Sequence, residues 1–134
     1  MSKINFEINK LSPDKTRVGF LKRIAEKTAK FVSLKGFKEI SIVVVCDARM
    51  KGLNRKYRGK NKATDVLAFD YGEIFICLPQ AKRQAKKLRH SLNKELAILL
   101  VHGILHLAGY DDRTRNKYNK MVKKQEEICQ KIIL

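Results

Sequence analysis

The segment from Leu96 to Ala108 constrains the fold of this 134-residue chain more than any other. Its sequence is L-A-I-L-L-V-H-G-I-L-H-L-A, which is apolar on every side of a helix except at His102 and His106. A helix that is hydrophobic all round is buried, so this one is expected at the centre of the domain. A buried imidazole without a partner costs about 1 to 3 kcal/mol. Two of them, four residues apart on one face, therefore predict a polar site on the central helix.

The residues that follow this helix complete a metal-binding spacing. Gly109 is expected to end the helix, and Asp112 then returns toward the same face, which gives the pattern H-x3-H-x5-D. Here the helix fixes two ligands and the turn delivers a third, so one coordination position stays open for water, as in catalytic zinc sites. We therefore predict one divalent ion, with zinc favoured, bound by His102, His106 and Asp112.

Two other metal chemistries use similar residues. Zinc proteases of the H-E-x-x-H type carry their general base directly after the first histidine, and Gly103 occupies that position here, which argues against peptide hydrolysis. Two histidines and one carboxylate also match the facial triad of non-haem iron oxygenases, a minor alternative because that triad normally lies on strands. Gly103 costs about 1 kcal/mol in a helix relative to alanine, and we expect the close approach of a strand or substrate to require it.

Positive charge is the second constraint. The chain has 30 Lys and Arg against 13 Asp and Glu, a formal net charge of +17. Residues 51–62 and 82–94 each hold six basic residues and no acid, and the chain from residue 113 onward supplies the remaining excess. This distribution favours a polyanion such as RNA as the partner, although solvated lysine-rich helices also produce such a charge.

Hydrophobic patterning predicts one α+β domain, a small mixed sheet of about four strands packed with helices around the metal-site helix. We expect strands at residues 4–8, 40–46, 66–69 and 73–78, and helices at residues 16–34, 47–57, 79–88, 91–108 and 114–133. The isolated cysteines argue against a disulfide framework or zinc finger. Without a signal peptide or an apolar span of about 20 residues, a cytoplasmic location and no membrane association are expected.

Four motifs together resemble those of the YbeY-type endoribonucleases, a family that acts in ribosomal RNA maturation. The family signature H-G-x-L-H-L-x-G-Y-D-H agrees with residues 102–112 at ten of eleven positions. L-N-x-x-Y-R-x-K-x-x-x-T-D-V-L-x-F corresponds to residues 53–69, G-D-I-x-I to residues 72–76, and H-S-x-x-x-E-L to residues 90–96. Two features differ. Asp112 stands where the family has its third histidine ligand, and the connection around Asp70 is shorter than in the family.

The resemblance implies roles outside the central helix. Arg58 would be a functional arginine near the metal, and a guanidinium suits a phosphodiester and the charge that develops on it. Asp65 is either structural or bonded to groups next to the metal ligands, and Asp111 either orients a histidine or closes the turn. Thr64 is expected to act as a cap or turn residue, and Cys77 to line the core or a groove. Candidate RNA-binding side chains are Lys56, Lys60, Lys62, Lys86, Arg89 and His90.

Two functions stay open at this point. The first is a metal-dependent endoribonuclease specific for single strands, acting in small-subunit rRNA maturation and ribosome quality control, in which a metal-activated water attacks a phosphodiester. Arg58 and His102 would be its catalytic residues. The second is a non-catalytic ribosome- or RNA-binding assembly factor whose metal site is weakened by Asp112, because a carboxylate lowers the net charge of the site. RNA, as ribosomal RNA or the small ribosomal subunit, is the expected partner, with no small-molecule organic cofactor.

Overall fold

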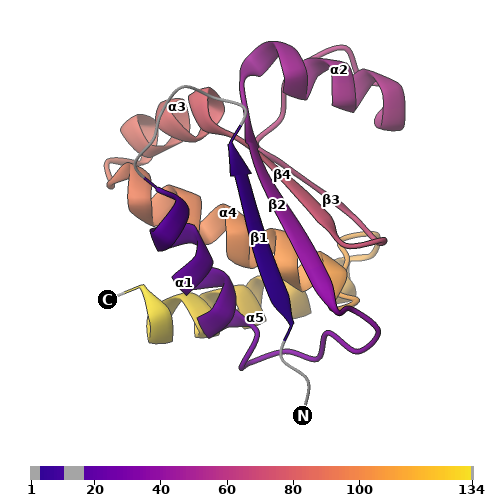
Figure 1. Ribbon diagram of the computed structural model, residues 1–134, viewed down its shortest axis with the longest axis vertical. Coiled ribbons are helices and arrows are strands. Elements are labelled where there is room, and N and C mark those ends of the chain that lie inside the picture. The colour runs from indigo at the N-terminus through magenta and orange to yellow at the C-terminus, as the bar shows by residue number, and fades with distance from the viewer. Residues whose placement is uncertain (1–3, 11–16, 134) are drawn as a thin grey trace.

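The computed structural model describes residues 4–10 and 17–133, which contain one four-stranded mixed sheet. Helices surround the sheet (Figure 1). The sheet order is β1-β2-β4-β3, with β1 parallel to β2, β2 parallel to β4 and β3 antiparallel to β4. This confirms the predicted α+β class. The strands are β1 (Asn5–Lys10), β2 (Glu39–Val45), β3 (Val66–Phe69) and β4 (Glu73–Cys77). The helices are α1 (Val18–Thr28), α2 (Asp47–Arg58), α3 (Leu78–Leu88), α4 (Leu92–Leu107) and α5 (Arg115–Ile132).

Side chains alternate along the strands and build an apolar cluster on each face of the sheet. Ile42 and Ile74 belong to the larger cluster, which includes residues of α1, α4 and α5. Val43 and Phe75, one position further along each strand, belong to a smaller cluster with Met50 of α2. The central strand β2 is therefore buried on both faces, as its continuous apolar run predicts.

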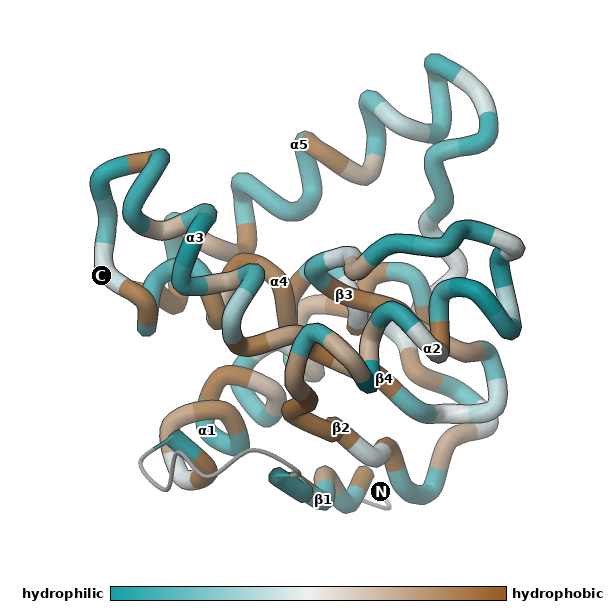
Figure 2. Tube along the Cα trace, turned by 90° about the horizontal axis from the view of Figure 1, so that it is seen from above, coloured by the Kyte–Doolittle hydropathy of each residue, from teal (hydrophilic) through white to brown (hydrophobic). Residues whose placement is uncertain are grey.

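Helix α4 lies in the middle of the molecule, between the sheet and α5 (Figures 1 and 2). Figure 2 shows hydrophobic colour along α4 and mostly hydrophilic colour along α2, α3 and α5. A Cβ added at Gly103 would lie 2.9 Å from Ile74 Cγ2, so the glycine lets α4 approach β4 closely. The strand thus accounts for Gly103. Neither α4 nor any other helix in the described part of the chain is long and apolar enough to cross a membrane.

Both ends of α4 follow the sequence prediction. Ser91 precedes the helix, and its side chain accepts a hydrogen bond from the backbone N–H of Lys94 at 3.1 Å. After the helix, Gly109 has φ +100°, a conformation that favours glycine. The backbone N–H of Tyr110 then donates to the carbonyl of Leu105 at 3.0 Å. These two caps set the length of α4 and place residue 112 beyond its C-terminal end.

The predicted helix at residues 16–34 is wrong at its C-terminal end, since α1 ends at Thr28. Thr28 turns its hydroxyl back onto the carbonyl of Ile24 at 2.7 Å, and the N–H of Phe31 then bonds three residues back to Thr28. Phe31 and Val32 continue the apolar spacing but pack against the core from an irregular segment. The predicted start at Thr16 lies outside the described residues.

Asp47 begins α2 without capping it, although aspartate is a common N-cap residue. It is the first helical residue, and its carboxylate instead binds the guanidinium of Arg83 in α3 at 2.7 and 3.0 Å. It also accepts a hydrogen bond from Cys77 Sγ at 3.3 Å. Burial raises the pKa of Cys77 to about 12, so this thiol is a neutral core group, consistent with its predicted place in the core. The contacts tie α2 and α3 together at the end of β4.

Candidate active site

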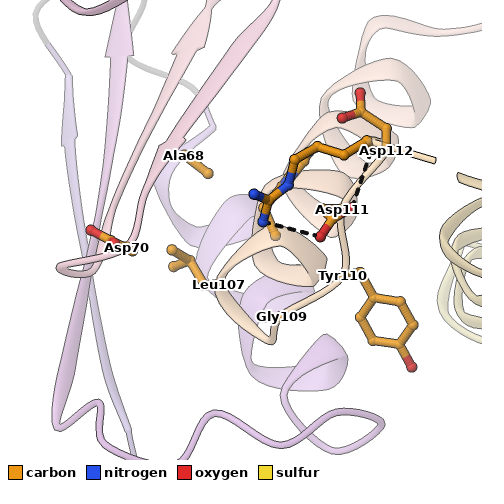
Figure 3. Close-up of a pocket in the computed structure, with 9 residues that line it drawn as sticks. Ala68, Asp70, Leu107, Gly109, Tyr110, Asp111 and Asp112 are labelled. Atoms are coloured by element: carbon orange, nitrogen blue, oxygen red, sulfur yellow. Dashed lines mark hydrogen bonds and ion pairs between the residues drawn. The ribbon is translucent and has the colours of Figure 1, made fainter. Parts of the chain in front are cut away.

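A cavity of about 290 Å³ brings together candidate residues from separate parts of the chain. Its walls come from the end of α2, the segment that leads into β3, the C-terminal half of α4 and the turn after α4. A second cavity of about 360 Å³ adjoins it and shares His106 and Asp112 (Figure 3). The structure thus gathers the site residues that lie far apart in the sequence. The candidate residues that line the first cavity are Arg58, Thr64, Asp65, His102, His106 and Asp112.

The two histidines of α4 face each other with Nε2 atoms 3.1 Å apart. Two nitrogen ligands of one tetrahedral zinc ion, each about 2.0 to 2.1 Å from the metal, lie about 3.3 Å apart. The separation of His102 and His106 is therefore close to what a shared ion requires. Imidazole nitrogen suits zinc, copper, iron and nickel. The pair fits a transition-metal ion by geometry and by donor chemistry.

Gln125 of α5 fixes the orientation of His102. Its side-chain oxygen Oε1 lies 2.8 Å from His102 Nδ1, and an amide oxygen can only accept, so Nδ1 carries the proton. The lone pair of His102 is then on Nε2, the atom that faces His106. Sequence reasoning missed this role, because only the apolar spacing of α5 was visible and the partner is 23 residues away.

The surroundings of His106 favour its neutral form. Burial lowers the pKa of His106, and the charge of His102 lowers it further, against the opposite effects of Asp112 and Asp111. A lowered pKa favours neutral imidazole near pH 7. Because a metal ligand must be deprotonated, the surroundings of His106 favour binding.

Asp112 is brought to the cavity without completing a group of three metal ligands in the described residues. It lines both cavities and is exposed to solvent. Over residues 4–10 and 17–133, no three His, Cys, Asp or Glu side chains are grouped closely enough to hold a metal ion. The two histidines therefore form a pair, and no third candidate ligand completes a metal site with them in the described residues. That Asp112 binds the ion stays a prediction.

Asp111 closes the turn before α5. One carboxylate oxygen accepts from the backbone N–H of Arg113 at 3.0 Å, and the other lies 3.4 Å from the Arg113 guanidinium and 3.7 Å from Lys117 Nζ. The Arg113 N–H and these cations lower the pKa of Asp111. In Figure 3 the side chains of Asp111 and Asp112 project from the turn in different directions. Of the two roles open for Asp111, the structure supports the turn.

Arg58 is the last residue of α2 and lines the same cavity as the histidines. Gly59 follows with φ +68° and ends the helix. The buried Asn54 donates from Nδ2 to the carbonyl of Lys62 at 2.8 Å, which ties the next segment back to α2. This bond fixes the connection between the two elements that form one wall of the cavity. In the sequence Asn54 stood out only as a motif position. The available signal of its hydrogen-bonding role was that asparagine has a low helix propensity.

The carboxylate of Asp65 is fixed in the cavity wall by contacts with neighbouring residues. Its Oδ1 accepts from the backbone N–H of Val66 at 2.7 Å and lies 3.5 Å from the Thr64 hydroxyl. Its Oδ2 lies 3.4 Å from Gln84 Nε2 of α3. The structural role of Asp65 is therefore present, and its position also places it in the cavity lining.

A buried polar network lies behind this wall. Glu95 of α4 is only 3% exposed and accepts from His90 Nε2 at 2.6 Å and from Gln84 Nε2 at 2.7 Å. Through Gln84 the network reaches Asp65 and the cavity. From the sequence Glu95 was visible only as a motif position, although a glutamate at the start of a wholly apolar helix was a signal of burial. His90, predicted to bind RNA, has this ring nitrogen already engaged.

The other predicted RNA-binding residues are exposed but lie outside the cavity lining. Lys56 is on α2, Lys60 and Lys62 follow it, Lys86 is on α3, and Arg89 is its C-terminal cap. Helices α2 and α3 contact each other through Asp47 and Arg83, and both lie at the same end of the sheet in Figure 1. The basic stretch of residues 51–62 reaches the first cavity through Arg58. The basic stretch that begins at residue 113 reaches the second cavity through Arg113.

Comparisons with known proteins point to one family. The family model for endoribonuclease YbeY matches residues 3–133. The chain belongs to the YbeY family. Endoribonuclease YbeY of Pelotomaculum thermopropionicum is 37% identical over 140 residues, covering 93% of this chain and 92% of that protein. Endoribonuclease YbeY of Aster yellows witches'-broom phytoplasma is 39% identical over 115 residues, covering 76% of this chain and 79% of that protein.

A solved structure shows the same YbeY-family fold. The solution structure of TM1509 from Thermotoga maritima is 30% identical in sequence and has a TM-score of 0.69. The match covers 93% of this chain and 87% of that one. The family resemblance carried by four motifs in the middle of the chain is thus confirmed for nearly all of it. The enzyme class that the family name states is an endoribonuclease, a nuclease that hydrolyses bonds within RNA.

Proposed function

We propose that this member of the YbeY family is a metal-dependent endoribonuclease that cleaves single-stranded RNA, with ribosomal RNA of the small subunit as its substrate and a role in ribosome quality control. The observation that carries the metal dependence is the convergence of His102 Nε2 and His106 Nε2 at 3.1 Å in a cavity that also holds Arg58. The net charge of +17 supports RNA as the partner.

The mechanism divides the work among a few side chains. His102 and His106 would hold the ion, and Asp112 would add a ligand from the mouth of the cavity. When bound, a divalent ion supplies an acidified water as nucleophile and polarises a phosphoryl oxygen. Gln125 keeps the proton of His102 on Nδ1, so that Nε2, the atom that would bind the metal, has a free lone pair. Arg58 binds the phosphodiester and stabilises the negative charge that develops on it.

The test is cleavage of single-stranded RNA with added Zn²⁺ and with a chelator. His102→Ala, His106→Ala and Arg58→Ala are each expected to lose cleavage, and the chelator should abolish it in the unmodified protein. Lys22→Ala is the control, because it removes one exposed cation from α1, away from the cavity. Unchanged cleavage in all three variants would contradict the proposal.

One observation favours a second function, an RNA-binding assembly factor of the ribosome that does not cleave. In the described part of the chain no three ligands are assembled, and Asp112 replaces the histidine of the family signature. Metal content decides between the two. One equivalent of a divalent ion supports the enzyme, whereas a clearly lower content with each divalent ion tried, together with no chelator-sensitive cleavage, supports the binding factor.

A further inference from the structure

Three aromatic side chains form an exposed group beside the cavity, which we call the aromatic platform: Tyr57, Phe69 and Tyr71. Phe69 lies in the middle, with Tyr57 edge-on at 5.0 Å between ring centroids and Tyr71 stacked at 5.7 Å and 17° between planes. Tyr57 is 53% exposed and Tyr71 is 67% exposed. Large aromatic surface is thus presented to solvent at one place by α2 and the hairpin of β3 and β4.

Tyr71 is held in one orientation although it is exposed. Its hydroxyl donates to Glu73 Oε1 at 2.7 Å, and this bond raises the pKa of Tyr71 to about 12. Phe69 stacks against the ring with an offset and nearly parallel planes, and because Tyr71 is 67% exposed, a face of its ring stays open to solvent. The backbone of the turn is closed by the N–H of Gly72 donating to the carbonyl of Phe69 at 2.9 Å. A ring that is already ordered loses little conformational entropy when a ligand covers it.

The aromatic platform is continuous with the candidate active site. Phe69 lines the same cavity as Arg58 and the two histidines, and Tyr57 directly precedes Arg58 in α2. Lys56 Nζ lies 5.2 Å from the centroid of the Tyr57 ring. A ligand that spans the cavity and the platform therefore meets cations on the α2 side and uncharged aromatic surface on the hairpin.

The charges on either side of the aromatic platform indicate how such a ligand is oriented. The basic stretch of residues 51–62 attracts phosphates to the α2 side, whereas Asp70 and Glu73 repel them from the hairpin. The hairpin is thus suited to the uncharged part of a nucleotide, its base. Proteins that bind single-stranded nucleic acid combine a basic surface with aromatic rings on which bases stack.

We propose that the free face of Tyr71 stacks an unpaired nucleobase of the RNA substrate, with Phe69 supporting the ring from behind and the cations of α2 binding the adjoining phosphates. This rests on the proposed function for the identity of the substrate as RNA. Bases in a duplex are stacked on one another and are not free for such a contact, so Tyr71 makes the site select single strands.

The test measures binding to a short single-stranded RNA by fluorescence anisotropy in a chelator, so that cleavage plays no part. Tyr71→Ala is expected to weaken binding about tenfold, the loss of one base stack, while Tyr71→Phe keeps the ring and binds nearly as the unmodified protein does. Tyr118→Ala is the matched control, since Tyr118 is 53% exposed on α5 and is not part of the platform. Equal affinity of Tyr71→Ala and the unmodified protein would overturn the proposal.

A second arm identifies the base contact directly. One abasic position is moved along the RNA, and at one position the unmodified protein should lose about the same tenfold, whereas Tyr71→Ala should lose nothing further. If the loss of affinity from Tyr71→Ala and the loss from the abasic site add in full at every RNA position, the proposed base stack is overturned. The chain has no tryptophan, so quenching of tyrosine fluorescence by RNA is an independent readout, and it should be smaller in Tyr71→Ala.

The outcomes separate this proposal from the proposed function. Binding that depends on Tyr71 without cleavage at any divalent ion would leave the base contact standing and remove the enzyme. RNA cleavage together with binding that does not depend on Tyr71 would leave the enzyme function standing and remove the base contact. Equal dependence on Tyr71 for duplex and single strand, or no RNA binding at all, would overturn the base contact and make the platform a candidate protein-docking surface.

Discussion

His102 and His106 lie on α4, while Asp112 lies in the turn that follows, and the two regions of this one motif differ in how firmly they are held. Helix α4 is packed on both sides, and Gln125 fixes the ring of His102. Asp112 is exposed, and it is the neighbouring Asp111 that carries the contacts of the turn. The helical pair is therefore already organised, whereas Asp112, which we predict to be the third ligand, is not held in the same way.

Removing a histidine should have the largest effect. His102→Ala and His106→Ala each delete half of the organised pair, so we expect the affinity for Zn²⁺ to fall by more than about a hundredfold, beyond what loss of a supporting residue costs. Asp112→Ala should cost less, because its side chain is not in place beforehand. Competition with a chromogenic chelator measures all three. An Asp112→Ala loss as large as that of His102→Ala would remove the contrast between the two regions.

Gln125 should come next, because it acts on the metal site only through His102. Gln125→Leu is expected to lower Zn²⁺ affinity and RNA cleavage about tenfold to a hundredfold, the usual cost of removing a group that orients a ligand. Gln125→Glu should restore much of both, since a carboxylate accepts the same proton. The control is Gln130→Leu, at an exposed position of the same helix. Equal effects of the two leucine variants would show that His102 needs no orienting partner.

Asp112→His should act in the opposite direction and by a smaller factor. A neutral imidazole restores the family signature and raises the net charge of the site, so we expect RNA cleavage in Zn²⁺ to rise severalfold. Steady-state cleavage rates and Zn²⁺ titrations measured in parallel follow this change. If both stay as in the unmodified protein, residue 112 is not a ligand, and the turn belongs to the fold alone.

The smallest effect concerns packing, and two glycines test it. Gly103→Ala places a Cβ 2.9 Å from Ile74 Cγ2 and should lower the free energy of unfolding by about 1 to 3 kcal/mol, less what is regained in helix propensity. Gly52 in α2 has no atom within 4 Å of an added Cβ, so Gly52→Ala should stabilise the protein by up to about 1 kcal/mol. Urea unfolding measures both. Stabilisation by both alanines would show that α4 can move away from β4.

Helix α4 with its two histidines, the more firmly held of the two regions, was also the region that the sequence predicted best. Apolar residues on every side of α4 and a histidine spacing of four specify a buried helix with two rings on one face, and local geometry suffices for that. The position of Asp112 depends on how the turn folds against α5. The partners of Glu95 and His102, Gln84 and Gln125, could not be paired from sequence, because both contacts join separate helices. The same lack of tertiary information explains why apolar spacing overextended α1.

The most direct test of the central claim, that the histidine pair of α4 builds a metal-dependent nuclease site, is a Zn²⁺ titration of chelator-treated protein with cleavage of single-stranded RNA as the readout. We expect no cleavage before Zn²⁺ is added, a rise that saturates near one ion per chain, and no rise in His102→Ala. Full cleavage without the ion, or an unchanged titration in His102→Ala, would contradict the claim.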